Sequence, residues 1–488
     1  MTTQTPAKTA DAQLGQLPLF VDLDGTLIAS DSLFECLLLC AKHRPLDLFK
    51  VPLWLTRGRA YLKARLADDR LDVTQLPYRA EVCEHLESER VRGRPIYLAT
   101  AADGRIASRV AEHLGLFEGV LASDGRKNLK SVRKLDAIRQ VAKVGFAYAG
   151  NSRADLVIWT EAESAILVNP PPAVARQLQR SGKVEKVFAS KGGIPRELVR
   201  VLRVHQWLKN MLVFVPLLTS FRFTQLSGTC ESIMAFLAFS LCASATYVMN
   251  DLLDIQSDRA HPRKRFRPLA SGRLSIPAGI AAAVVALCLG LAIAVAQSFA
   301  FTAILGIYLV ITTAYSWYLK TRVLMDVIVL AVLYTIRIIG GAVVLGVPMS
   351  VWLLAFALFV FLSLALVKRC SELMTLKSIG VVKTRGRNYG VDDLKVFWPM
   401  GVATAVCSVL VFALYINSAD MPAHYATPSL LWLIALALFY WLGRLWIKTG
   451  RGEMADDPLV YTLTDFGSRV VIAGMVLVTL AAYFLRLG

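Results

Sequence analysis

Two groups of acidic residues in this chain have the types and spacing that phosphate chemistry needs. The first group is Asp22 and Asp24 in the run Asp-Leu-Asp-Gly-Thr, which follows a short apolar segment. Two carboxylates two residues apart at the end of a strand point to the same side. One can attack phosphorus while the other moves protons to and from the leaving oxygen. The alternative interpretation is an ordinary turn rich in Asp and Gly.

The second group lies between residues 247 and 273. Its oxygen-bearing members are Asn250, Asp251, Asp254 and Asp258. On a helix, Asn250, Asp254 and Asp258 would stack on one face, with Asp251 beside them. Carboxylates at the end of an apolar span are costly without a partner, and a divalent cation such as Mg²⁺ is a natural one. A solvated helix end would explain one or two acids, but not four oxygen ligands in register.

Basic residues follow these acids directly. They are Arg259, His261, Arg263, Lys264, Arg265 and Arg267. Acids followed at once by cations suit a Mg²⁺-bound diphosphate that carries further phosphate groups. The alternative is a plain cluster of charges that ends a membrane span, which would account for some of these residues.

The first acidic group is expected at the edge of a sheet. Short apolar runs near 18–27, 95–100, 146–151 and 165–169 are predicted strands, and 30–90 reads as helical. Alternating strands and helices favour an α/β fold with a doubly wound parallel sheet, in which ligands bind at the carboxyl ends of the strands. We place this domain at residues 18–172, after a polar tail over 1–17. Residues 173–200 are interpreted as a basic, amphipathic linker along the membrane surface.

Composition sets the remainder of the chain apart. Of 488 residues, 55% are hydrophobic and 18% are charged, which excludes a disordered protein and is too apolar for an ordinary soluble enzyme. The net charge of +18 favours a membrane protein with basic loops over one that binds nucleic acid. Residues 201–488 are predicted to form an all-α domain of about nine transmembrane helices. These spans lie near 208–222, 231–250, 276–296, 299–317, 324–345, 350–367, 396–416, 429–446 and 469–485.

Charge also predicts the orientation in the membrane. With the N-terminus inside, basic residues gather in the cytoplasmic loops, while the opposite loop 417–427 contains no Lys or Arg. Residues 1–17 show no secretory signal. Both acidic groups are therefore expected on the cytoplasmic side of a bacterial-type inner membrane. The eight cysteines include no C-x-x-C pair, so neither a zinc site nor a disulfide framework is indicated.

The first domain resembles the haloacid dehalogenase (HAD) superfamily over roughly residues 17–170. Thr100, after the second strand, looks like that family's second motif, and Lys130 looks like its phosphate-binding lysine. The run from Gly150 to Asp155 looks like its acidic fourth motif. The resemblance also implies that the helical insert is a cap over the site.

In that resemblance Asp22 is the nucleophile and Asp24 the acid/base, while Thr100 and Lys130 bind the phosphate. The implied Mg²⁺ ligands are Asp22, Asp24, Asn151 and Asp155. Many members carry Asp where this chain has Asn151, and the amide removes a negative charge from the metal site. A domain retained for folding or regulation is the alternative to an active phosphatase.

Residues 196–488 resemble the UbiA superfamily of intramembrane prenyltransferases. The N-D-x-x-D-x-x-x-D pattern that starts at Asn250 looks like its first metal motif. Aromatic prenyltransferases of this superfamily carry a second Asp-rich motif in a later loop, whereas this chain has a cationic stretch from Lys368 to Tyr389. That stretch and the runs 258–268 and 314–320 closely resemble the decaprenyl-phosphate phosphoribosyltransferases.

This branch implies 5-phosphoribosyl diphosphate as donor and a polyprenyl phosphate as acceptor. Mg²⁺ would be held by Asn250, Asp251, Asp254 and Asp258. The implied phosphate-binding residues are Arg265, Arg267, Lys320, Lys368, Arg369, Arg385, Arg387 and Tyr389. The HAD-like domain is then expected to remove the 5-phosphate of the product, which leaves polyprenyl-phosphoryl-ribose.

Two other classes of function stay open. The first is prenyl transfer from a polyprenyl diphosphate to an aromatic acceptor, with an accessory phosphatase domain. It fits the first metal motif equally, but the cationic second loop argues against it. The second is a transporter or lipid-binding scaffold, which would be supported by half-chain symmetry or paired broken helices. Neither feature is clear in the sequence.

Overall fold

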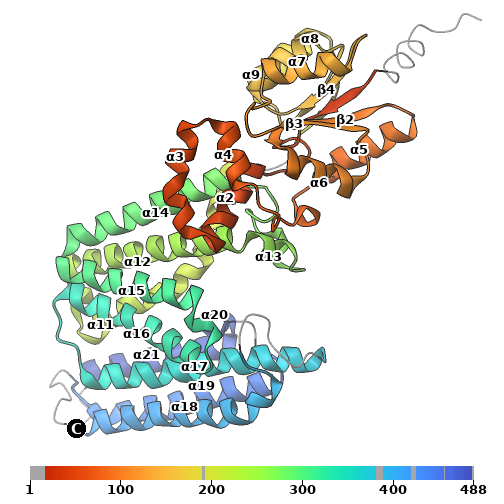
Figure 1. Ribbon diagram of the computed structural model, residues 1–488. Helices are drawn as coiled ribbons and strands as arrows, with labels where there is room; N and C mark the ends of the chain where they lie inside the picture. Colours follow the sequence, from red (N-terminus) through yellow and green to blue (C-terminus); the bar gives the residue numbers. More distant parts are fainter. Residues whose placement is uncertain (1–16, 190–192, 381–387, 419–424, 455–456, 486–488) are drawn as a thin grey trace, which may run out of the picture. The chain divides into compact units, whose positions relative to one another are not determined.

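The computed structural model describes residues 17–189, 193–380, 388–418, 425–454 and 457–485 (Figure 1). The chain forms two compact units. Unit 1 comprises residues 1–202 together with 247–284, and unit 2 comprises 203–246 together with 285–488. The second acidic group thus belongs to the same unit as the N-terminal domain.

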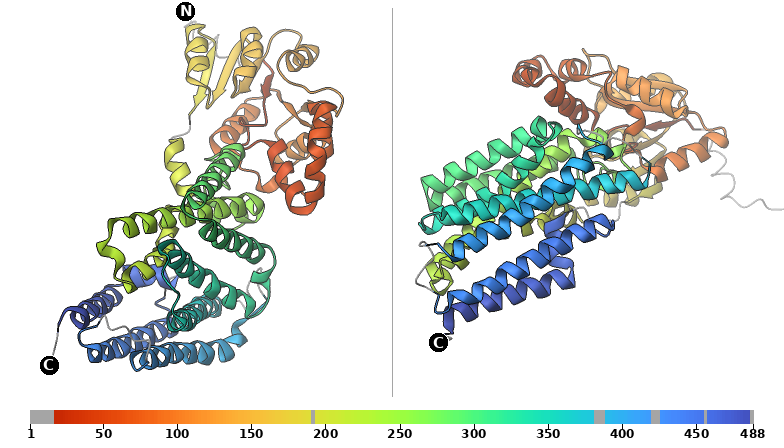
Figure 2. Two further views of the ribbon diagram at one scale, coloured as in Figure 1. Left: turned by 90° about the vertical axis from the view of Figure 1, so that its left-hand side faces the viewer. Right: turned by 90° about the horizontal axis from the view of Figure 1, so that it is seen from below.

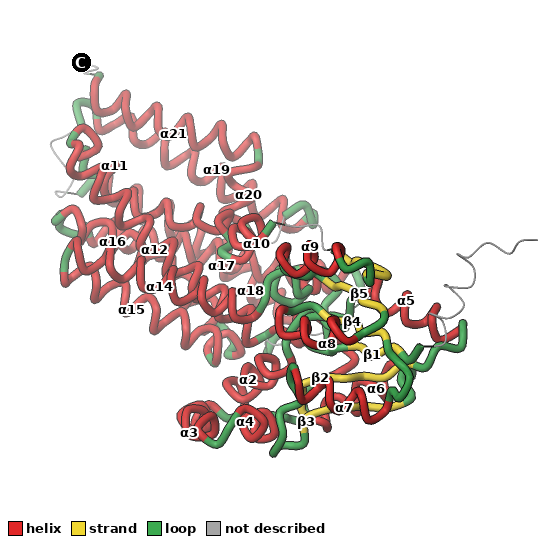
Figure 3. The backbone as a smooth tube through the Cα atoms, turned by 90° about the horizontal axis from the view of Figure 1, so that it is seen from above, coloured by secondary structure: helices red, strands yellow, loops and turns green. Residues whose placement is uncertain are grey.

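Unit 1 is built on a six-stranded sheet in which every pairing is parallel. The strands are β1 (Leu19–Val21), β2 (Ile96–Asp103), β3 (Gly119–Ser123), β4 (Ala147–Gly150), β5 (Ser164–Val168) and β6 (Val184–Phe188). Their order is β3-β2-β1-β4-β5-β6, so the chain winds outward from β1 in both directions. Figure 3 shows the strands with helices on either side. The predicted doubly wound α/β fold is confirmed.

Both faces of this sheet are covered, which explains why its strands read as continuous apolar runs. Leu19 and Val21 belong to one core with α5 (Ala80–Val91) and α6 (Gly104–Leu114). Phe20 belongs to the opposite core, formed with α7 (Val132–Val141), α8 (Leu156–Glu161) and α9 (Pro172–Arg180). All three side chains of β1 are fully buried. Asp22 therefore follows a strand that packing fixes on both sides.

The sheet extends into the segment 173–200, which the sequence pattern predicts as a linker. Helix α9 covers one face of the sheet, and β6 pairs with β5 as the edge strand. Three of the five β6 residues are exposed, because an edge strand keeps much of its surface in water. Glu185 and Lys186 interrupt its three apolar residues, so this short run does not stand out as a strand in the sequence. Within the described part of this segment, α10 (Ile194–Val201) then follows β6.

The insert between β1 and β2 forms the expected helical cap. Its elements are α2 (Ser32–His43), the 3₁₀ helix η1 (Pro45–Lys50), α3 (Val51–Thr56), α4 (Arg59–Leu66) and the 3₁₀ helix η2 (Val73–Gln75). Helix α2 begins after Asp31, whose carboxylate accepts the Leu33 N–H over 2.9 Å. Leu38 of α2 packs in one cluster with Leu252 and Ile276. Within unit 1, the cap is thus bound to the second acidic segment.

Among the described residues, eight helices are long and apolar enough to cross a membrane. They are α12 (Leu226–Leu253), α14 (Ile276–Gln297), α15 (Phe299–Trp317), α16 (Met325–Leu345), α17 (Val351–Ser378), α18 (Leu394–Ile416), α19 (Leu431–Gly450) and α21 (Phe466–Phe484). Each overlaps a predicted span. In unit 2 the long helices run alongside one another (Figure 2).

The first predicted span, 208–222, is not a helix of membrane length. Its residues form the 3₁₀ helix η4 (Val204–Phe214) and the short α11 (Val215–Thr219). Pro216 supplies no backbone N–H. Trp207 donates to Ser244 over 2.9 Å and Asn210 donates to Ser240 over 3.0 Å. This segment contacts both α12 and α16, since Asn210 also accepts a hydrogen bond from Arg337 of α16 over 2.7 Å.

Candidate active sites

The first site is organised by a chain of buried hydrogen bonds at the carboxyl edge of the sheet. Lys134 Nζ donates to Asp22 Oδ1 over 2.8 Å and to the Tyr148 hydroxyl over 3.0 Å. Tyr148 donates in turn to Asp155 Oδ1 over 3.0 Å. Burial raises the pKa of Asp22, and the Lys134 ammonium opposes that rise. Lys134 thus fixes Asp22 at the end of β1.

The lysine of this site is one helical turn away from the residue that the sequence predicts. Lys130 is exposed and precedes α7, whereas Lys134 lies in its first turn and is 2% exposed. The run Lys130-Ser-Val-Arg-Lys134 offers two lysines four residues apart. Only the start of α7 decides which of them faces the sheet edge, and the sequence pattern does not fix that start.

Asp24 is held by the beginning of the cap. Its Oδ1 accepts the Ser32 N–H over 2.7 Å, and its Oδ2 accepts the Ser32 hydroxyl over 3.1 Å. Burial and the neighbouring Asp31 carboxylate raise the pKa of Asp24 to about 7. A carboxyl group with this pKa can give and take a proton near neutral pH, as an acid/base requires.

The fourth motif forms a tight loop around Asp155. Its Oδ2 accepts the Ser152 N–H over 2.9 Å, the Ser152 hydroxyl over 2.8 Å and the Asn151 N–H over 3.3 Å. Because the Tyr148 hydroxyl donates to Oδ1, both oxygens of this carboxylate accept hydrogen bonds. The carboxylate therefore holds the loop in place. The loop places the Asn151 amide against Gly25, whose φ is +78° and where a Cβ would collide with that amide.

Thr100 and a cap lysine complete the surroundings of this site. Thr100 is fully buried in β2, and its hydroxyl accepts the Ala102 N–H over 3.0 Å. Lys63 of α4 donates to the Ala101 carbonyl over 2.6 Å. Burial lowers the pKa of Lys63, while the nearby Asp24 opposes that effect. Sequence reasoning missed Lys63 because it lies in the insert, far from the motifs.

The second acidic group does not form the single helical stack that the spacing predicts. Helix α12 ends at Leu253, and α13 (Ile255–Arg259) starts after a break at Asp254. Arg267 Nη1 donates to Asp251 Oδ1 over 3.0 Å and to Asp258 Oδ2 over 2.6 Å. Asp251 and Asp258 therefore converge on one position, and that position holds a positive charge.

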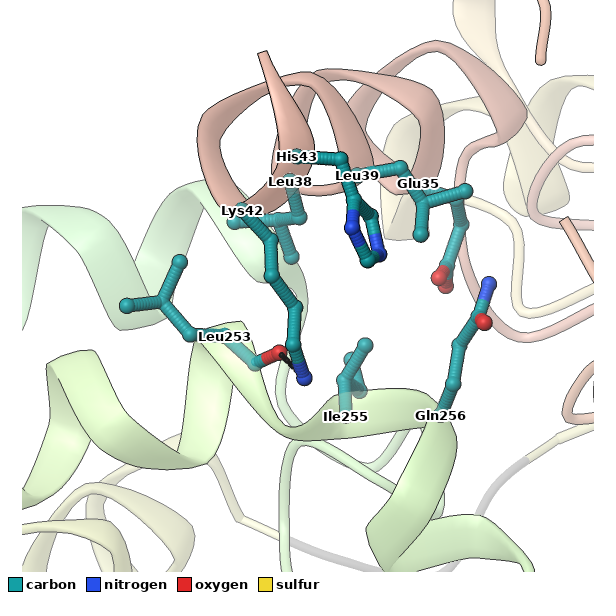
Figure 4. A pocket seen from close by; sticks show the side chains of 8 residues that line it. All are labelled: Glu35, Leu38, Leu39, Lys42, His43, Leu253, Ile255 and Gln256. Carbon is teal, nitrogen blue, oxygen red and sulfur yellow. Dashed lines mark hydrogen bonds between the residues drawn. The ribbon is translucent and has the colours of Figure 1, made fainter. Parts of the chain in front are cut away.

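Asp254 points to the cap instead. Lys42 of α2 donates to Asp254 Oδ1 over 3.0 Å and to the Leu253 carbonyl over 3.0 Å. Figure 4 shows Lys42 and Glu35 on the wall of a small pocket between α2 and the α12–α13 turn. Arg265, by contrast, is exposed, and its guanidinium lies over the Phe266 ring, 4.9 Å from the centroid.

In unit 2 a second cluster surrounds Arg369. This fully buried side chain donates to Asp326 Oδ2 over 2.5 Å, to Glu372 over 2.8 Å and to the Tyr315 hydroxyl over 3.1 Å. Tyr389 also donates to Asp326. The sequence predicts Arg369 and Tyr389 as phosphate ligands, and the structure brings them together on Asp326. Asp326 was missed because a single acid in an apolar run gives no motif.

The remaining predicted cations have different surroundings. Lys368 lies 3.6 Å from Asp457, a carboxylate that also accepts from Lys209 at 2.5 Å. These two lysines lower the pKa of Asp457 against the effect of its burial. Lys320 is half-buried in the 3₁₀ helix η7 (Leu319–Thr321). Arg385 and Arg387 lie outside the described residues.

The model of the UbiA prenyltransferase family matches residues 219–456. An uncharacterized protein, y4nM, of Sinorhizobium fredii is 40% identical over 92% of this chain and 88% of its own length. Nodulation protein NoeC of Azorhizobium caulinodans is 34% identical over 56% of this chain and 89% of its own. A decaprenyl-phosphate phosphoribosyltransferase of Corynebacterium glutamicum is 30% identical over 53% of this chain and 79% of its own.

The chain belongs to the UbiA prenyltransferase family. The UbiA match includes both the acidic turn at 250–258 and the Arg369 cluster, while the sheet domain lies outside it. With eight membrane-length helices, this UbiA protein is a multi-pass membrane protein. The match to y4nM covers 92% of the chain, so that relative shares most of the sheet domain as well as the UbiA region.

The donor sets at both sites suit Mg²⁺, although in the described residues no three His, Cys, Asp or Glu side chains form a metal cluster by themselves. In the UbiA region, Asp251 and Asp258 already share one cationic group, so the position between them accepts positive charge. In the sheet domain, Asp22, Asp24 and the Asn151 amide lie around one turn. Oxygen ligands of this kind are those that Mg²⁺ prefers.

Proposed function

We propose that the UbiA-type domain transfers 5-phosphoribose from phosphoribosyl diphosphate to a polyprenyl phosphate, and that the sheet domain then removes the 5-phosphate. The observation that carries the first step is the bridge of Arg267 between Asp251 and Asp258. A donor with a diphosphate and a separate phosphate needs carboxylates for a metal and cations for the other charges, and this turn supplies both. The C. glutamicum relative is named decaprenyl-phosphate phosphoribosyltransferase, and this name supports the same transferred group and the same class of acceptor.

In the transfer, an oxygen of the lipid phosphate attacks the anomeric carbon of the ribose, and inorganic diphosphate leaves. Asp251 and Asp258 would hold Mg²⁺, which neutralises the diphosphate when bound, while Asp254 is paired with Lys42 of the cap. Arg267, released from the two acids, would pair with phosphate oxygens. Asn250 and the cations Lys320, Lys368, Arg385 and Arg387 are further candidates for donor contacts. Arg369 of α17 is engaged with Asp326 of α16, so we assign it a positioning role.

The second step uses the sheet domain. Asp22 attacks the phosphorus of the 5-phosphate and forms an aspartyl phosphate, while Asp24 protonates the leaving ribose oxygen. Asp24 then takes a proton from the water that hydrolyses the aspartyl phosphate. Lys134 holds Oδ1 of Asp22 and would screen the charge of the approaching phosphate. Asp22 and Asn151 would hold Mg²⁺, which leaves the Asp24 side chain to give and take the proton, and Asp155 would fix the loop that carries Asn151.

An assay with purified full-length protein tests the proposal. Phosphoribosyl diphosphate labelled in the ribose is incubated with polyprenyl phosphate and Mg²⁺, and the lipids are extracted. Label in the lipid fraction is expected. A parallel reaction with polyprenyl diphosphate and an aromatic acceptor distinguishes prenyl transfer. If only the aromatic acceptor is modified, the phosphoribosyltransferase assignment is wrong and the alternative function, aromatic prenyl transfer, is supported.

A further inference from the structure

The cap of the sheet domain exposes a row of large apolar side chains. Leu46 is 76% exposed, Phe49 is 82% exposed and Leu53 is 58% exposed. Their spacing of three and four residues along η1 and α3 puts them on one face of this helical segment. Leu48, Val51 and Trp54, on the other face, pack against the core of unit 1. The segment is thus apolar on both faces, whereas a helix on a water-facing surface has a polar outer face. We call Leu46, Phe49 and Leu53 the cap apolar surface.

Basic residues surround the cap apolar surface. The stretch from Arg44 to Arg59 contains four basic residues and one acid, Asp47. Arg57 and Arg59 are exposed, and the side chain of Lys50 is 60% exposed while it pairs with Asp47. A row of apolar side chains with a cationic rim is complementary to a bilayer surface that carries anionic headgroups.

The position of this segment in unit 1 favours the same partner. It follows α2, and Lys42, in the last turn of α2, donates to the carbonyl of Leu253, the last residue of the membrane-length helix α12. Leu38 of α2 packs with Leu252 and with Ile276, the first residue of the membrane-length helix α14. The cap segment therefore starts where one membrane-length helix ends and the next begins.

We propose that the cap apolar surface lies in the membrane interface, with Leu46, Phe49 and Leu53 among the acyl chains and the basic rim on anionic phospholipid headgroups. The N-terminal domain would then contact the membrane directly, in addition to its covalent link to the membrane-spanning helices. This contact would hold the site of Asp22 and Asp24 at the lipid surface. The proposal extends the proposed function to a lipid-borne substrate, but the contact itself does not depend on catalysis.

Photocrosslinking in a bilayer tests the contact directly. The full chain carries p-benzoylphenylalanine in place of Phe49 and is placed in nanodiscs of phosphatidylethanolamine and phosphatidylglycerol. The matched control carries the same group in place of Val144, which is 93% exposed and precedes β4, at the opposite edge of the sheet from Asp22. After irradiation, the peptide with residue 49 is expected to gain the mass of a phospholipid, and the peptide with residue 144 is not. Equal labelling of both peptides, no lipid on residue 49, or a crosslink from residue 49 to a second copy of the chain would each overturn the proposal.

A second measurement separates this contact from the chemistry. The double variant Phe49→Glu with Leu53→Glu is compared with Val144→Glu, which also adds acid to an exposed apolar position. The double variant should lose most of its rate on a phosphorylated ribosyl lipid in vesicles and keep its rate on p-nitrophenyl phosphate in solution. An equal loss on both substrates, or no loss on the lipid, contradicts the membrane contact. If the wild type hydrolyses neither substrate, the proposed phosphatase function fails, and the crosslink still decides the membrane contact.

Discussion

Arg259 and Glu35 form a buried, two-pronged ion pair between the acidic turn and the cap. Arg259 Nη1 donates to Glu35 Oε2 over 3.1 Å, and Nη2 donates to Oε1 over 2.6 Å. Both side chains are almost fully buried. Helix α2 holds Asp24 through Ser32 at its first residue and Arg259 through Glu35 one turn later. One short helix therefore contacts both candidate sites within unit 1.

Glu35→Ala should destabilise unit 1 by about 3–5 kcal/mol, because Arg259 would stay buried without a counter-charge. The double variant Glu35→Leu with Arg259→Met should recover much of that loss, since it removes both charges. A double-mutant cycle of thermal unfolding in detergent measures the coupling between the two residues. Additive effects of the two single substitutions would show that the pair does not hold the cap to the acidic turn.

Lys134→Ala should slow hydrolysis of a soluble phosphate ester about 10- to 150-fold, the cost of one charge-assisted hydrogen bond of roughly 1.5–3 kcal/mol. The matched control is Lys130→Ala, which removes an exposed lysine four residues earlier and should leave the rate nearly unchanged. Steady-state kinetics with p-nitrophenyl phosphate compares the two. A larger loss in the Lys130 variant would restore that residue as the phosphate-binding lysine.

Asp31→Asn should move the pH profile of the phosphatase. Asp24 must be protonated to act as the acid, so activity should fall as pH rises through about 7. The Asp31 carboxylate raises the pKa of Asp24 by charge repulsion, so its loss should shift this falling limb to lower pH. Asn caps a helix as well as Asp does, so α2 should persist. An unchanged limb would mean that a different group controls the high-pH side.

The sequence predicted the fold well where one physical signal dominated. Apolar length located the eight long helices, and apolar runs that end in acids located the central strands. It failed where that signal is short or interrupted. In β6, Glu185 and Lys186 interrupt a short apolar run, and in 208–222 the apolar length of a span is divided between η4 and α11.

For the sites, the motifs found the acids but not all of their partners. Lys134, Lys63, Glu35 and Asp326 reach the candidate sites from elements distant in sequence. Sequence reasoning also missed Arg337, which is buried in α16 and donates hydrogen bonds to Asn210 and Tyr308. The helix also breaks at Asp254, so that its carboxylate pairs with Lys42. A spacing argument that assumes one ideal helix does not predict this pairing.

Arg267→Ala should weaken donor binding about 10- to 150-fold, because one charge-assisted contact worth roughly 1.5–3 kcal/mol is lost. Arg265→Ala is the matched control two residues away, since that guanidinium is exposed and lies over Phe266. The KM for phosphoribosyl diphosphate and the KM for the lipid are measured in both variants. A change confined to the lipid KM would contradict the assignment of Arg267 to the donor.

In the proposed function, one chain first transfers phosphoribose to a lipid and then removes the 5-phosphate. Asp22→Asn separates the two steps, because an amide cannot form the aspartyl phosphate, while the acidic turn of the UbiA region is unchanged. Extracted lipids from the wild type and the variant, each supplied with phosphoribosyl diphosphate and polyprenyl phosphate, are compared by mass spectrometry. The wild type should yield polyprenyl-phosphoryl-ribose, and the variant should accumulate the same lipid with one additional phosphate. If the wild type also stops at the phosphorylated lipid, or if neither protein modifies the lipid, the two-step function is contradicted.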